Sequence, residues 1–124
     1  MKQKQKGSTS RRKLSEMIVN VAGEYLAIAE TVDERENYLR SACTAWNIAC
    51  LPPLRREHAL RRYCEQYRKT NQADETDCKN FEQDIRLLIK QKDRLYPDIN
   101  VQIVDSMTER INGKDHVTVV SVHR

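Results

Sequence analysis

The chain has 124 residues, a formal net charge of +4 at pH 7, 39% hydrophobic residues and 32% charged residues. This length predicts one domain and excludes most two-domain enzymes. No apolar run approaches the roughly 20 residues that cross a bilayer, so we expect neither a membrane span nor the apolar region of a signal peptide. The sequence therefore predicts a cytoplasmic protein that does not associate with membranes.

The positive charge belongs to the N-terminus. Removing the six cations of residues 1–13 from the 22 Lys and Arg leaves 16 against 18 Asp and Glu, so the chain from residue 14 onward is slightly acidic. Residues 1–9 have almost nothing apolar to bury, which predicts a disordered basic tail before a single domain over residues 10–124. A transit peptide is the alternative, which the excess of Lys over Arg disfavours. The six cations are Lys2, Lys4, Lys6, Arg11, Arg12 and Lys13.

Between residues 10 and 96, apolar side chains recur at steps of three and four, which predicts four amphipathic helices. The first follows Ser10 and extends to Ala29. The second begins at a cap, which is either Thr31 with Glu34 or Asp33 with Glu36 as the capping-box partner, and Leu51-Pro52-Pro53 ends it. We interpret Trp46, on the apolar side of this second helix, as a core residue, with a partner-binding aromatic patch as the alternative.

The third predicted helix, over residues 54–69, has two distinct faces. Its apolar residues fall within a sector about 100° wide. The fourth helix begins after Asp74 and ends before Pro97, and we expect the cations near its end to complement the helix dipole. The apolar sector of the third helix consists of Leu60, Tyr63, Cys64 and Tyr67. The cations of the fourth helix are Arg86, Lys90, Lys92 and Arg94.

Beyond Pro97 the apolar spacing changes to alternation, and Asn112-Gly113 separates two such runs. This pattern predicts an antiparallel β-hairpin over about residues 98–123. A strict two-residue turn would pair Asp105 with Val120, which mixes the two faces, so we expect a bulge or a wider loop over residues 106–113. The predicted fold is α+β and mainly helical, with four helices in antiparallel pairs and a C-terminal hairpin whose edge pairs two chains in a homodimer.

The sequence offers few parts for catalysis or metal binding. The four cysteines occupy apolar helix positions without a CxxC pair, so we interpret them as core thiols, with a zinc or iron–sulfur site as the alternative. None of the three histidines has a readable nucleophile, and the three glycines form no phosphate-binding loop. We therefore expect no metal, no cofactor and no enzymatic activity. The cysteines are Cys43, Cys50, Cys64 and Cys78.

Two functions remain. The first is a protein-interaction, adaptor or regulatory module with a protein partner. The alternative is a nucleic-acid-associated regulator that binds phosphates through the tail over residues 1–13 and the basic face of the third helix. Two acids interrupt that face and the rest of the chain is acidic, so a solvated helix face is the plainer interpretation. The candidate phosphate-binding residues of the helix are Arg55, Arg61, Arg62, Arg68 and Lys69.

Overall fold

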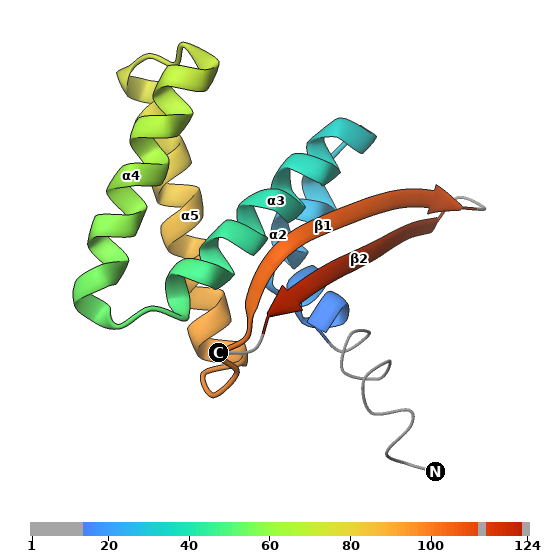
Figure 1. Cartoon of the computed structure of the whole chain (residues 1–124). Helices are drawn as coiled ribbons and strands as arrows, with labels where there is room; N and C mark the ends of the chain where they lie inside the picture. Colours follow the sequence, from blue (N-terminus) through green and yellow to red (C-terminus); the bar gives the residue numbers. More distant parts are fainter. Residues whose placement is uncertain (1–13, 112–113, 123–124) are drawn as a thin grey trace.

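The computed structural model describes residues 14–111 and 114–122, with side chains described through Ile103. The predictions for the basic tail, including all six of its cations, lie outside the described residues. As the sequence predicts, the described part is mostly helical, and five helices precede two strands (Figure 1). These are a helix over residues 14–21, α2 (Gly23–Ile28), α3 (Val32–Ala49), α4 (Pro53–Asn71), α5 (Glu75–Leu95), β1 (Gln102–Ile111) and β2 (Lys114–Val122).

The first predicted helix is broken at Ala22, so the prediction of one continuous helix was wrong. Ala22 leaves the helical conformation with φ −84° and ψ 1°. Helical hydrogen bonds nevertheless span the break, because Ala22 N–H donates to Ile18 and the Ala22 carbonyl accepts from Leu26. Gly23 follows at once, and glycine has a low helix propensity. The spacing of apolar residues gives no sign of this locally low helix propensity.

The central helix is α3, which contacts α2, α4, α5 and β1. Thr31 caps it as predicted, since its hydroxyl accepts a 3.1 Å hydrogen bond from the Glu34 N–H. The Glu34 carboxylate in turn accepts from the Glu30 N–H, one residue earlier than in a standard capping box. Trp46 is completely buried, which confirms its interpretation as a core residue. Ala45 and Ile48 are buried as well, so α3 is covered on more sides than the predicted apolar face.

Helices α4 and α5 form an antiparallel pair that projects beyond the rest of the helices (Figure 1). The turn between them begins at Gln72, which adopts a left-handed φ of 50°. Asp74 then caps α5 by accepting a 2.8 Å hydrogen bond from the Asp77 N–H. The rings of Tyr67 and Phe81 stack between the two helices with centroids 4.1 Å apart.

The predicted apolar sector of α4 is correct for Leu60, which is buried, and wrong for Tyr63, which is 38% exposed. Helix α5 packs on α3 as well as α4. Within α5, the apolar residues Ile85 and Leu88 are buried. The sequence did not anticipate the third buried residue of this helix, Lys92, which is 1% exposed and lies with its ammonium 5.1 Å from the centre of the Trp46 ring. Lys92 therefore belongs to the core, where the ring face stabilises its charge.

Two side chains of α3 and that of Cys50, the residue after the helix, hold residues 99–103 at the start of β1. The Trp46 indole N–H donates to the Val101 carbonyl at 2.7 Å. Asn47 makes two 2.7 Å hydrogen bonds to residue 103, because its amide donates to the Ile103 carbonyl and its oxygen accepts from the Ile103 N–H. The Cys50 thiol lies 3.8 Å from the Ile99 carbonyl. Carbonyls two residues apart point the same way in an extended chain, so residues 99, 101 and 103 meet one side of α3.

Strands β1 and β2 pair in antiparallel fashion. Gln102 lies opposite Val122 at one end, and Ile111 lies opposite Lys114 at the other. Asp105 lies opposite Val120, as a strict two-residue turn requires, so the expectation of a different pairing there and of a wider loop over residues 106–113 was wrong. The one register shift lies between Ile103 and Asp105, at the start of β1, because a bulge there restores the alternation of faces. The turn residues Asn112 and Gly113 lie outside the described part of the chain.

Arg56 fixes the corner between α3 and α4. Its guanidinium donates to the carbonyls of Ala49 and Leu51, at 2.6 and 3.1 Å. Carbonyls at the C-terminal end of a helix have no N–H partner within the helix, so Arg56 supplies donors there. The same group forms a two-point ion pair with Asp93 of α5, at 2.8 and 3.2 Å. One side chain thus joins three helices at a corner that begins with two prolines.

We expect Arg56→Ala to lower the free energy of unfolding by about 1.5–3 kcal/mol, the range for hydrogen bonds that involve a charged group. Chemical denaturation of the purified protein measures this loss. Arg62→Ala is the matched control on the same helix, because Arg62 is exposed and should cost less than about 0.5 kcal/mol. Equal effects of the two substitutions would show that the corner does not depend on Arg56.

Candidate functional site

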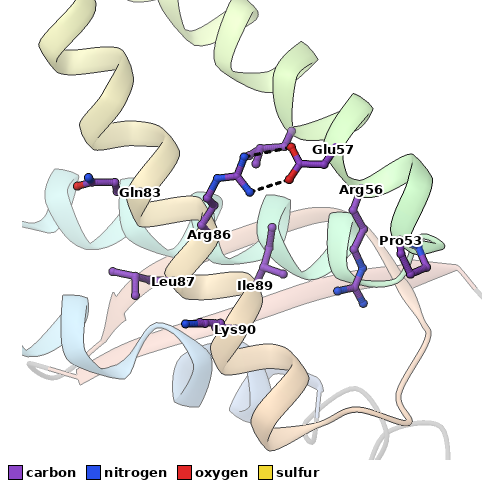
Figure 2. A pocket seen from close by; sticks show the side chains of 9 residues that line it. Pro53, Arg56, Glu57, Gln83, Arg86, Leu87, Ile89 and Lys90 are labelled. Carbon is purple, nitrogen blue, oxygen red and sulfur yellow. Dashed lines mark hydrogen bonds and ion pairs between the residues drawn. The ribbon is translucent and has the colours of Figure 1, made fainter.

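An open groove of about 580 Å³ lies between α4 and α5. Its apolar lining comes from Pro53 and Leu60 of α4 and from Leu87 and Ile89 of α5. Leu60 is buried and forms part of the floor, whereas Leu87 is 52% exposed. Polar side chains complete the lining of the groove (Figure 2). They are Arg56, Glu57, Gln83, Arg86 and Lys90.

An ion pair bridges the two helices within this lining. Arg86 of α5 meets Glu57 of α4 through two hydrogen bonds, at 2.8 and 3.1 Å (Figure 2). The remaining Nε–H of Arg86 donates to Glu82 at 3.0 Å. These bonds raise the pKa of Arg86 above its usual value, with Glu57 as the largest cause and Glu82 as the next. The pair fixes the spacing of α4 and α5 at the groove.

Arg86 also lowers the pKa of Glu57, chiefly through its hydrogen bonds and then through its charge. A carboxylate whose pKa is lower in the folded state stabilises the protein above its unfolded pKa of about 4.3, and this contribution disappears as the pH falls through the folded value. We therefore expect Glu57→Gln to lower the melting temperature at pH 7 and to have a much smaller effect at pH 3. Thermal denaturation of both proteins at the two pH values measures the difference. An equal loss at both values would contradict an ionised Glu57–Arg86 pair.

Leu87 and Lys90 separate the groove from a second hollow, which lies between α5 and the helices of residues 14–28. Val21 and Tyr25 form part of this hollow on one side, and Arg94 lines it on α5. The Tyr25 hydroxyl donates to Asp84 at 2.9 Å, and burial together with this carboxylate raises the pKa of Tyr25. The hydrogen bond therefore holds Tyr25 against α5. Leu87 lines both the groove and the second hollow.

The candidate phosphate-binding residues of α4 fall into two groups. Arg55, Arg62 and Lys69 lie seven residues apart and line the outward surface of α4, where all three are exposed. None of the three forms an ion pair with a described residue. Arg61 and Arg68 do not line this surface, and Arg68 pairs with Glu65 one turn away. The structure therefore brings together three of the five predicted helix residues.

Sequence reasoning missed the groove between α4 and α5. The signal was Leu87, which lies next to Leu88 but outside the buried positions of α5. An apolar residue outside the core face of an amphipathic helix indicates apolar surface that stays exposed after folding. It does not reveal which neighbouring helix will form the opposite wall, because that depends on how α4 and α5 pack.

Of the four cysteines, Cys43 is buried and the other three are partly buried, so the prediction of a buried core thiol is correct for Cys43 alone. Burial raises the pKa values of Cys50 and Cys64. Within the described ranges, no three side chains of the types His, Cys, Asp and Glu come together as a metal site.

No helix of the described residues has the length and apolar character needed to span a bilayer. Comparisons with family models, curated proteins and solved structures find no match to this chain. Its function is therefore argued from the groove between α4 and α5 and from the outward surface of α4.

Proposed function

We propose that the protein is a non-enzymatic interaction module that binds a segment of a partner protein in the groove between α4 and α5. The observation that carries this proposal is the half-exposed Leu87 beside the apolar lining from Leu60 and Ile89. Protein interfaces typically combine a small apolar centre with a polar rim. The groove has this composition, because charged and amide side chains surround its apolar residues.

The size of the groove suits an inserted side chain. Its volume of about 580 Å³ lies within the range of about 300–1,000 Å³ that binding pockets occupy. A few large side chains seated in such pockets supply most of the affinity of a typical interface. A groove between two antiparallel helices also suits an amphipathic helix, which places its apolar face in a groove of this kind. The partner segment therefore contributes at least one large apolar side chain.

A library of random 16-residue peptides displayed on phage tests this proposal, with the full-length protein as the target. We expect peptides whose affinity falls by more than about tenfold when Leu87→Glu places a charge at the groove. Leu54→Glu is the matched control, because Leu54 is 93% exposed on α4 and does not line the groove. Circular dichroism establishes that both variants fold. Failure to select any peptide, or binding that Leu87→Glu leaves unchanged, would refute the proposal.

Nucleic-acid binding is a second candidate because Arg55, Arg62 and Lys69 form a basic stripe on α4 without an ion pair to any described residue. Seven residues of helix rise about 10.5 Å, so the stripe extends over roughly 21 Å. If it contacts phosphates, alanine at all three positions will weaken DNA or RNA binding and flatten its salt dependence. The Arg61→Ala/Arg68→Ala double variant removes cations outside the stripe and serves as the control. Fluorescence anisotropy at two salt concentrations distinguishes the two sets.

We also propose that the fold is α+β with a C-terminal hairpin, that the protein is cytoplasmic, and that two chains form a homodimer through the hairpin. A two-stranded sheet leaves one edge of each strand unpaired, and such edges can pair with a second chain. Analytical ultracentrifugation of the full-length protein tests the dimer, which predicts a mass that increases with concentration.

A further inference from the structure

The charges of the groove between α4 and α5 largely neutralise one another. Arg56 is paired with Asp93, and Arg86 is paired with both Glu57 and Glu82. Among the described residues that line the groove, Lys90 is the one charged side chain without an ion pair. The groove therefore presents apolar surface together with a single available positive charge.

Lys90 lines the groove, so a ligand bound there would contact its ammonium group. It follows Leu87 by three residues and Arg86 by four, so all three share one side of α5. Lys90 and Leu87 both line the second hollow as well. Arg94 is a second cation in the lining of that hollow, and among the described residues it bonds only to the neutral Gln91. Glu24 is the one acid in the described lining of the same hollow. No ion pair joins Glu24 to Lys90.

We infer that the partner segment carries an acidic side chain within one helical turn of its apolar anchor, so that the anchor enters the groove beside Leu87 while the acid meets Lys90. This inference rests on the proposed function, because it specifies the chemistry of the segment that binds there. A basic residue at that position would face Lys90 and Arg94 without compensation, and a neutral one would leave Lys90 unpaired. The acid thus gives acidic apolar segments an advantage over neutral and basic ones.

The same peptide selection tests the inference when it is repeated with two charge-reversed targets. We expect Asp or Glu near a large apolar residue in peptides selected on the natural protein, and Lys or Arg at that place in peptides selected on Lys90→Glu. Lys79→Glu is the control, because Lys79 is an exposed lysine of α5 that does not line the groove. Selection on Lys79→Glu should again yield acidic peptides.

A single selected peptide then provides the quantitative test. Replacing its acid by the matching amide should weaken binding to the natural protein about three- to fivefold, as expected for an exposed ion pair. The same replacement should have almost no effect on binding to Lys90→Gln. Peptides that need Leu87 but show no acidic preference would overturn the inference and leave the proposed function in place. Failure to select any peptide that needs Leu87 would overturn both.

Discussion

Trp46→Ala is expected to destabilise the protein by about 3–5 kcal/mol, the range for removing a large aromatic side chain from a core. Trp46 has no exposed surface and packs against the ring of Tyr96 at a centroid distance of 6.0 Å. The substitution also removes the hydrogen bond to Val101 and the ring face beside the Lys92 ammonium. A buried charge that loses its partner is costly, so the loss should lie at the upper end of this range.

Chemical denaturation followed by circular dichroism measures this effect. Total stabilities of small domains are about 5–15 kcal/mol, so the Trp46→Ala protein is expected to unfold at far lower denaturant concentration or to be partly unfolded without it. Leu54→Ala provides a surface control and should change stability by less than about 0.5 kcal/mol. A loss below about 1 kcal/mol for Trp46→Ala would contradict a central position for this residue.

Asn47→Ala should give the second largest effect, about 2–4 kcal/mol, although Asn47 is only partly buried. Its amide makes both hydrogen bonds of residue 103, and Ile103 is buried. The truncation leaves a buried N–H and a buried carbonyl without partners, and each such group costs about 1–3 kcal/mol. We expect the chain leading into β1 to detach from α3 before the helices unfold.

Hydrogen exchange measures this separation directly. In Asn47→Ala, the amide protons of residues 101–103 should exchange much faster than in the natural protein, while those of α3 and α5 change little. Asn37→Ala, at an exposed position of the same helix, serves as the control. Uniform acceleration across the helices would instead indicate that Asn47 supports the whole core, and unchanged exchange at residue 103 would refute its role.

The fold was predictable where local chemistry determines it. Thr31 and Asp74 are N-caps whose side chains bond to a nearby N–H, so the sequence located the start of α5 and restricted that of α3 to two candidate caps. Burial of Trp46 followed from its place on an apolar helix face. Lys92 could not be predicted in the same way, because its burial depends on Trp46, a residue far away in the chain, presenting its ring to the ammonium.

The candidate site was predictable only in part, for the same reason. The sequence identified α4 as a basic helix, and the periodicity of α4 places Arg55, Arg62 and Lys69 on one surface. The groove arises from two helices, and which residues of α5 face α4 depends on their packing. The pairing of Arg86 with Glu57, 29 residues apart, fixes that arrangement, and Lys90 has no ion pair to a described residue. Neither partner stands out in the sequence.

The most direct test of the central claim is a methyl NMR titration of the full-length protein with a peptide selected by its need for Leu87. The claim predicts that the methyl resonances of Leu60, Leu87 and Ile89 shift and saturate together at one peptide per chain, while those of Leu54 on the outward surface of α4 remain in place. Shifts concentrated at Leu54, with the groove leucines unmoved, would contradict it and place the binding surface on the basic face of α4.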